Sequence, residues 1–220
     1  MLAEVERSDL NRFPGLKGAR ETSMSQADRE KWEARYAGDD GGEVRRVDPF
    51  LEQVAEELPS SGRALDLAGG TGRNALFLSR RGLNVTLVDI SSQGLARARS
   101  AAEAEGLSIS TQSLDLDENS LPDGPFDLVV CTWFLLDARN WKEIASALGS
   151  DGRVVYVQPT PEHCERHAHP SRRFTVEFSE LKAAISAARI HPVRLEQGWD
   201  ENGNHTARLL GRPFEGAEGP

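Results

Sequence analysis

Hydrophobic positions along this chain alternate between short continuous runs and segments with helical spacing. The continuous runs are rich in Val, Leu and Ile, and they predict buried strands at 64–67, 85–88, 108–114, 126–134 and 154–157. Between and around these runs, apolar residues recur every three or four positions. That spacing predicts helices at 28–37, 47–57, 73–81, 92–104, 140–148 and 177–189, with Ser91 or Ser92 as the N-cap of the fourth.

The end of the chain has a different pattern. Segments 192–199 and 205–210 flank the turn-forming sequence Glu201-Asn202-Gly203-Asn204, which predicts a β-hairpin. Strands that alternate with helices and are apolar throughout are typical of a parallel sheet covered on both faces. The pattern therefore predicts an α/β fold: a doubly wound, seven-stranded, mostly parallel sheet with a C-terminal antiparallel hairpin.

Three segments differ in character. Residues 1–26 lack a sustained apolar period, which predicts a poorly ordered tail. Residues 27–213 form the predicted domain, and we expect a loose C-terminal tail at residues 214–220. Met24 is a possible alternative start, which leaves open whether residues 1–23 belong to the working protein.

Composition narrows the classes of partner. The 220 residues carry 26 Lys and Arg against 35 Asp and Glu, a formal net charge of −9. This excess of acids argues against a sequence-independent nucleic-acid binder. No apolar run approaches the roughly 20 residues of a membrane span, and the acidic N-terminal sequence is unlike a signal peptide. Two cysteines form no disulfide framework. With the preceding observations, this leads us to expect a cytoplasmic protein without a membrane partner. The sequence does not distinguish a monomer from a dimer.

Acids end three successive predicted strands, where ligands bind in sheets of this kind. Asp66 precedes a turn with Gly69, Gly70 and Gly72 that allows a ligand to approach the backbone. Asp89 can accept hydrogen bonds from ribose hydroxyls, and Asp115 from an adenine amino group. Each feature alone also fits a ligand-free turn, a helix N-terminal acid or a solvated loop. Together the three predict an adenosine-containing ligand.

Charge favours one such ligand over another. The segment Gly70-x-Gly72-x-x-Ala75 fits a loose dinucleotide fingerprint, so a nicotinamide coenzyme must be weighed. Its pyrophosphate would be repelled by Asp66, whereas the ammonium and sulfonium of S-adenosylmethionine would be attracted. At about 4 Å and an intermediate dielectric, each interaction is worth a few kcal/mol. Asp66 therefore favours S-adenosylmethionine.

These motifs resemble those of a known family, the class I S-adenosylmethionine-dependent methyltransferases. The similarity rests on Leu65-Asp66-Leu67-Ala68-Gly69-Gly70-Thr71-Gly72-Arg73-Asn74-Ala75-Leu76, Val88-Asp89-Ile90-Ser91, Leu114-Asp115-Leu116 and Phe126-Asp127-Leu128-Val129-Val130. Trp32-Glu33-Ala34-Arg35-Tyr36 and Gly72-Arg73-Asn74-Ala75 are similar to the small-molecule branch, which contains tellurite-resistance and thiopurine methyltransferase-like proteins. The resemblance covers about residues 31–212, with one departure at Ala68, where most members carry Gly.

The resemblance implies a set of residues that bind the cofactor. Asp66 would face the methionine amine, Asp89 the ribose, and Asp115 the polar edge of the adenine. The remaining contacts implied are Ala68, Gly69 and Gly70 through the backbone, Ile90 on the adenine, Leu116 beside Asp115, and Thr132 and Trp133 near the methionine chain. Trp32, Arg35 and Tyr36 resemble a helix that closes over the cofactor, with Arg35 as partner of its carboxylate. Packing on the sheet edge explains Trp32 and Tyr36 equally well.

The segment after the fifth strand, residues 158–173, occupies the position of the family's substrate loop. His163, Cys164, His167 and His169 lie close in sequence, but their spacing fits no zinc pattern, and we expect no metal site. His163 and His167 are candidate general bases for an oxygen or nitrogen nucleophile. Arg166, Arg172 and Arg173 of this loop either hold an anionic substrate or are solvent-exposed. Glu196 and His205 of the hairpin either border the same cleft or lie on a solvated face.

Taken together, the sequence predicts an enzyme, an S-adenosylmethionine-dependent methyltransferase. Its acceptor would be a small molecule: a thiol, a metalloid anion, an amine or a hydroxyl. Methyl transfer is an in-line displacement, so alignment of the two reactants can supply much of the rate. The alternatives are a nicotinamide-dependent oxidoreductase, a non-catalytic S-adenosylmethionine-binding module, and a methyltransferase that acts on protein or nucleic acid.

Overall fold

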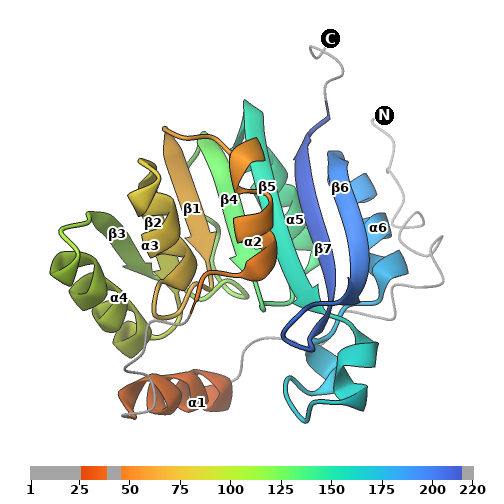
Figure 1. The fold of residues 1–220 in the computed structure, drawn as a ribbon, viewed down its shortest axis with the longest axis horizontal. Helices are drawn as coiled ribbons and strands as arrows, with labels where there is room; N and C mark the ends of the chain where they lie inside the picture. The colour runs from red at the N-terminus through yellow and green to blue at the C-terminus, as the bar shows by residue number, and fades with distance from the viewer. Residues whose placement is uncertain (1–25, 39–45, 215–220) are drawn as a thin grey trace, which may run out of the picture.

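The computed structural model describes residues 26–38 and 46–214, and apart from Gln26 and Phe214 the predicted tails 1–26 and 214–220 lie outside this range. A seven-stranded sheet has the order β3-β2-β1-β4-β5-β7-β6 (Figure 1). Its strands are β1 (Arg63–Leu67), β2 (Asn84–Asp89), β3 (Ile109–Ser113), β4 (Phe126–Thr132), β5 (Leu148–Pro159), β6 (Ile190–Trp199) and β7 (His205–Pro213). The first five strands pair in parallel, and β7 pairs antiparallel with both β5 and β6. The predicted fold class is confirmed.

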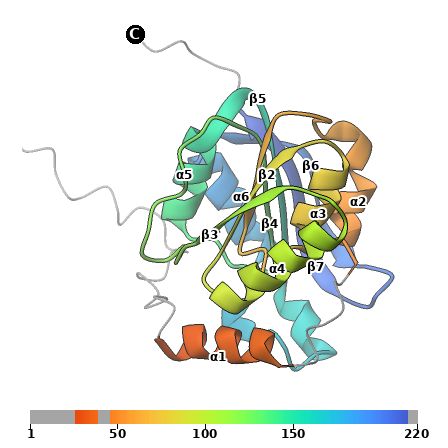
Figure 2. The ribbon, with the colours of Figure 1, turned by 90° about the vertical axis from the view of Figure 1, so that its left-hand side faces the viewer.

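Helices cover both faces of this sheet. The α-helices are α1 (Gln26–Ala37), α2 (Pro49–Gln53), α3 (Arg73–Arg80), α4 (Ser92–Ala104), α5 (Ala138–Ala147) and α6 (Phe178–Ala187). Short 3-10 turns are η3 (Ala55–Glu57), η4 (Pro161–Glu165) and η5 (Arg172–Phe174). Figure 2 shows α5 and α6 on one face and α2, α3 and α4 on the other. Each layer encloses its own apolar core, centred on Trp141 and Tyr156 on the first face and on Leu51 and Leu87 on the second.

Local sequence explains where the helices begin. The Ser91 hydroxyl accepts a hydrogen bond from the Gly94 amide at 3.1 Å, which makes Ser91 the N-cap of α4 as predicted. Asp137 forms a capping box with Asn140, so α5 begins at Ala138. The predicted start of β5 at 154 was wrong: the strand begins at Leu148, because Leu148 already pairs with Phe126 of β4.

The strand order reverses between β1 and β4, since β1 pairs with β2 on one side and β4 on the other. Helix α1 lies beyond the sheet, near the turn that connects β1 to α3 and the N-terminus of α4 (Figures 1 and 2). In the part of the chain that the structure describes, no helix is both long and apolar enough to span a membrane.

Candidate functional site

The turn from β1 to α3 brings Asp66 next to a glycine loop. Asp66 is fully buried, and neither carboxyl oxygen has a hydrogen-bond partner among the described residues. Burial raises the pKa of Asp66 to about 7, and the Arg73 charge and the nearby Ala75 N–H, which does not reach hydrogen-bond geometry, offset only part of this effect. A Cβ added at Gly69 would lie 2.5 Å from Asp66 Oδ2, so glycine is needed for the loop to pass over this carboxyl group.

Ala68 and Gly70 give this loop its shape. Ala68 has a φ of 51° and Gly70 a φ of 56°, both in the left-handed region that glycine adopts most easily. Above Gly70 lies Tyr36 of α1: a Cβ at Gly70 would be 2.5 Å from its hydroxyl oxygen. The two structural elements that the sequence assigned to the cofactor, the loop and the N-terminal helix, are therefore in contact.

Asp89 ends β2 and is bonded to this loop. Its Oδ2 accepts from the Gly70 amide and its Oδ1 from the Ser91 amide, both at 2.8 Å. Burial raises the pKa of Asp89, and these two hydrogen bonds act in the opposite direction. Each oxygen keeps a second lone pair, so the carboxylate can also accept from a ribose hydroxyl. Ile90, the next residue, is half-buried.

Asp115 follows β3 and contacts α1. Its Oδ2 lies 3.2 Å from Arg29 Nη2, and its Oδ1 accepts from the Asp117 amide at 3.0 Å. The side chain of Leu116 is buried in the core, and its carbonyl accepts from Asn140 at 2.9 Å. The same carbonyl also accepts from Arg139, so neither the side chain nor the carbonyl of Leu116 is free to meet a ligand.

Glu33 holds α1 against α4, a role that the sequence did not suggest. One carboxylate oxygen accepts from the Ser92 amide at 2.8 Å, and the other from the Ser91 hydroxyl at 2.8 Å and the Gln93 amide at 3.1 Å. Partial burial works against the charged form, but these hydrogen bonds outweigh it and lower the pKa of Glu33. An acid on α1 that can reach a helix N-terminus is the only sequence signal, and it is weak.

Arg35, the predicted partner of the cofactor carboxylate, lies on α1 next to Trp32. It is exposed, and its guanidinium group lies 5.3 Å from the centre of the Trp32 ring, which in turn stacks on Tyr36. Arg73, the first residue of α3, is nearer to the loop and lowers the pKa of Asp66. The sequence held a usable signal here, because a cation directly after the glycine turn is placed to meet a ligand carboxylate.

Arg73 belongs to a small polar cluster at the end of β4. Its Nη2 lies 3.5 Å from Asp48 Oδ2 and 3.4 Å from the Thr132 hydroxyl. Asn74 donates to the same hydroxyl at 3.0 Å and accepts from the Asp48 amide at 3.1 Å. The buried Thr132 is thus held by α3, and its side chain orients the loop residues that follow.

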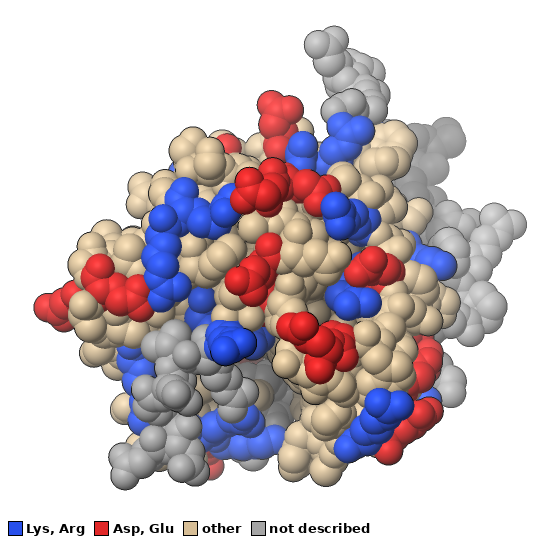
Figure 3. Space-filling view, in the orientation of Figure 1, with Lys and Arg blue, Asp and Glu red and all other residues tan. Residues whose placement is uncertain are grey.

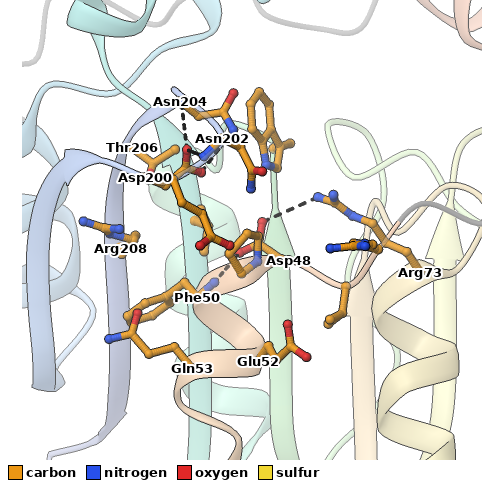
Figure 4. Close-up of a pocket in the computed structure, with 16 residues that line it drawn as sticks. Asp48, Phe50, Glu52, Gln53, Arg73, Asp200, Asn202, Asn204, Thr206 and Arg208 are labelled. Carbon is orange, nitrogen blue, oxygen red and sulfur yellow. Dashed lines mark hydrogen bonds and ion pairs between the residues drawn. The ribbon is translucent and has the colours of Figure 1, made fainter.

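A pocket of about 560 Å³ opens beside this cluster (Figure 4). Its walls come from the segment before α2, from α2, from the ends of β4 and β5, and from the β6–β7 turn. Trp133 lines it with an indole that is 36% exposed and hydrogen-bonds to Asp48. Trp133 has a φ of 64°, an unusual backbone conformation for a bulky residue, and turns the chain sharply after β4.

The loop after β5 packs over the strand ends beside this pocket. Both ring nitrogens of His163 are engaged: Nδ1 accepts from the His205 amide at 3.3 Å, and Nε2 donates to the His169 carbonyl at 3.1 Å. His167 stacks on His163 and donates through Nε2 to the Gly203 carbonyl at 2.8 Å. The structure therefore leaves His163 without a free lone pair, whereas His167 retains Nδ1.

His205 begins a second chain of hydrogen-bonded polar side chains. From the sequence it was expected only to border the cleft or face solvent. Its Nδ1 lies 2.6 Å from the Thr160 hydroxyl oxygen, and that hydroxyl donates to Glu162 at 2.6 Å. The hydrogen bond from Thr160 lowers the pKa of Glu162. Glu196 instead pairs with Arg208 at 3.2 Å. Among residues 26–38 and 46–214, no group of three or more His, Cys, Asp or Glu side chains is placed to hold a metal ion.

The residues around Asp66 fit S-adenosylmethionine. A buried carboxyl group without a partner suits the methionine ammonium, and the glycine loop passes closely over it with Tyr36 of α1 above Gly70. Asp89 and Asp115 would hold the ribose and the adenine amino group, the latter in competition with Arg29. Arg73 would hold the methionine carboxylate. A pyrophosphate at the same place would meet an unpaired buried acid.

Comparisons with known proteins agree with this geometry. Residues 64–156 match the family described as "Methyltransferase domain". The tRNA 5-carboxymethoxyuridine methyltransferase of Escherichia coli K12 is 35% identical over 107 residues, 46% of this chain and 41% of the relative. The demethylmenaquinone methyltransferase of Thermus thermophilus is 38% identical over 117 residues, 52% and 51% of the two chains. The chain thus spans about half the length of these relatives.

Solved structures share the fold. The [4+2]-cyclase SpnF superposes with a TM-score of 0.71 at 18% identity, over 89% of this chain and 97% of that one. TehB from Haemophilus influenzae superposes with a TM-score of 0.63 at 24% identity, over 84% and 66%. Residues 64–156 thus resemble a methyltransferase domain, and the sheet has the fold that these solved structures share.

Proposed function

We propose that this protein transfers a methyl group from S-adenosylmethionine to a small-molecule acceptor. The observation that carries the proposal is Asp66, a fully buried carboxyl group without a hydrogen-bond partner directly beneath the glycine loop. The bound cofactor would supply an electrophilic methyl group on a sulfonium. Asp66 and Arg73 would orient its methionine end, and Asp89 its ribose, so that the sulfonium points toward the pocket at Trp133.

The size of the pocket and the charge of the chain support a small-molecule acceptor over a nucleic acid. The curated relatives include tRNA and rRNA methyltransferases by name, but this chain carries a net charge of −9. Asp48, Glu52, Asp200 and Glu201 line the pocket and would repel a phosphate backbone. A pocket of about 560 Å³ is the size of those that hold metabolites.

Alignment of the two reactants is the main contribution expected from the chain. An in-line displacement requires no covalent intermediate, so a rigid pocket next to the sulfonium can supply several kcal/mol of the barrier reduction. Helix α1, held by Glu33 over the glycine loop, and the loop after β5 that contains His163 would exclude water from the reacting atoms. His167, through its free Nδ1, is the remaining candidate base of the two predicted.

Calorimetry with S-adenosylhomocysteine tests the proposal directly. We expect binding to the wild-type protein, at least tenfold weaker binding to Asp66→Asn, and no binding of reduced nicotinamide dinucleotide. A screen with radiolabelled methyl groups against thiols, amines, phenols and metalloid oxyanions would then identify the acceptor. Binding of the nicotinamide coenzyme without S-adenosylhomocysteine would favour the oxidoreductase, and cofactor binding without transfer to any acceptor would favour a binding module.

A further inference from the structure

The pocket beside Trp133 has a charge pattern that selects among methyl acceptors. Its lining combines four carboxylates with three guanidinium groups: Asp48, Glu52, Asp200 and Glu201 with Arg46, Arg73 and Arg208. Figure 4 shows Asp48 and Glu52 on one side and Asp200 on the other, with Arg73 linked to Asp48 by an ion pair. Figure 3 shows acidic side chains in the middle of this face, with basic side chains distributed around them.

Two of the three arginines already have acidic partners. Arg73 pairs with Asp48 at 3.5 Å, and Arg208 pairs with Glu196 at 3.2 Å, from outside the lining. Glu52 and Glu201 are exposed at the pocket and have no ion pair within the described residues. The pocket therefore presents a surplus of negative charge to an acceptor, together with the half-exposed Trp133 indole.

This surplus acts differently on the possible nucleophiles. Nearby carboxylates raise the pKa of a thiol or phenol and repel an oxyanion, so they oppose the anionic form that attacks. A weakly basic amine, such as an aryl amine, is already neutral near pH 7 and needs no proton removed before it attacks, whereas the same carboxylates would hold a strongly basic alkylamine as its unreactive ammonium. When the nitrogen lone pair of the neutral amine forms the N–C bond and the C–S bond electrons return to sulfur, the positive charge passes from sulfur to nitrogen. Carboxylates and an indole face both stabilise a cation that develops there.

On this basis, and given the proposed function, we propose that the pocket binds a weakly basic amine that is neutral near pH 7 and that the enzyme is an N-methyltransferase for small aryl amines and similar weakly basic amines. The product is an ammonium that releases its proton to water at the open side of the pocket. Glu52 and Glu201 stabilise the positive charge, and Trp133 contacts the alkylated nitrogen. Asp48 has a separate role, since it orients Trp133 and Arg73.

The test compares acceptor classes on one protein. Radiolabelled methyl transfer is measured with panels of primary and secondary amines, thiols, phenols and selenium or tellurium oxyanions. The leading acceptor is then assayed with Glu52→Gln, Glu201→Gln and the double variant. Glu103→Gln, an exposed acid on α4, is the matched control. Calorimetry with S-adenosylhomocysteine on every variant reports the cofactor site independently.

We expect turnover of amines alone, and kcat/KM about tenfold lower in the double variant at unchanged S-adenosylhomocysteine affinity. Glu103→Gln should match the wild type. Turnover of thiols or oxyanions in preference to amines, no turnover of any amine, or an unchanged kcat/KM in the double variant would each overturn the amine assignment. In those cases, retained S-adenosylhomocysteine binding leaves the proposed function standing, whereas its absence from the wild type overturns both.

Discussion

Glu33 of α1 caps the N-terminus of α4 at Ser92, whose amide and hydroxyl both donate to Oε1, at 2.8 and 3.0 Å. The same helix reaches Asp115 through Arg29, and Arg97 of α4 donates to the Gly38 carbonyl just after α1 at 2.7 Å. Helix α1 thus binds through its own polar groups to structural elements that also carry the cofactor residues. Cofactor affinity should therefore depend on contacts that lie outside the glycine loop.

Glu33→Gln tests this dependence. A neutral amide loses the charge that favours a helix N-terminus and half of the hydrogen-bond acceptors, a loss of about 1 kcal/mol for a partly exposed group. We expect S-adenosylhomocysteine to bind several-fold more weakly, and amide hydrogen exchange to rise in α1 and at Ser92. Glu103→Gln on the same α4 helix provides the control. Unchanged exchange in Glu33→Gln would show that α1 is held by other contacts.

Asp66→Asn should change the pH dependence of stability. The pKa of Asp66 is raised from 3.8 to about 7 in the folded protein, so the folded state binds more protons than the unfolded state between these values. Stability therefore falls as pH rises from about 4 to 7, by on the order of 4 kcal/mol for this group. An asparagine at this position carries no charge and so avoids that loss of stability. Burial of its unpaired amide costs about 1–3 kcal/mol instead.

Urea unfolding at pH 5 and pH 8 measures this effect. We expect the variant to lose less stability than the wild type between these two pH values, and to be the more stable protein at pH 8. Some decline should remain, because burial also raises the pKa of Asp48 and Asp89. An equal change in unfolding free energy between pH 5 and pH 8 for variant and wild type would mean that Asp66 has a partner outside the described residues.

Asp89→Asn should weaken cofactor binding. Asp127→Asn, at the opposite end of the parallel strands, is the matched control. The amide cannot accept from both Gly70 and Ser91 as the carboxylate does, so the loop loses one of its two anchors. We expect S-adenosylhomocysteine affinity to fall at least tenfold by calorimetry. Asp127→Asn removes a carboxylate that accepts from the Arg63 amide at 2.7 Å, at the start of β4, and should leave affinity unchanged.

The sheet could be predicted from sequence because burial on both faces produces continuous apolar runs. The runs at β1, β2 and β4 stand out for this reason. The extent of β5 could not be predicted, because Gly149 and Gly152 interrupt the apolar pattern while the backbone still pairs with β4. Pairing of this kind depends on a partner strand distant in sequence rather than on local composition.

The placement of Asp66, Asp89 and Asp115 at neighbouring strand ends could be predicted from the strand pattern, and their roles toward a ligand stay predictions. The site was not predictable where the contact depends on how α1 docks. Glu33 and Arg29 meet partners 58 and 86 residues away, and no local pattern encodes such distances. Arg35 shows the same limit, because a helix alone does not reveal which of its cations faces the cofactor.

Ala68→Gly should relieve strain in the loop. Ala68 is at a φ of 51°, where a Cβ costs roughly 1–2 kcal/mol, and glycine adds about 0.5–1 kcal/mol of unfolded-state entropy. We expect unfolding free energy to rise by up to about 1 kcal/mol, with S-adenosylhomocysteine affinity equal or higher. A loss of stability in urea unfolding would show that the methyl group packs against the core well enough to offset the strain.

His163→Gln separates a structural histidine from a catalytic one. Burial lowers the pKa of His163, so its folded state binds fewer protons, and stability is lost as pH falls below the unfolded value of about 6.5. Glutamine can keep both backbone hydrogen bonds and does not titrate, so the variant should lose less stability between pH 7 and pH 5. Because both ring nitrogens are already bonded, methyl transfer at pH 8 should stay within a few-fold of wild type. A loss of about a hundredfold or more in a folded variant would instead establish His163 as the general base.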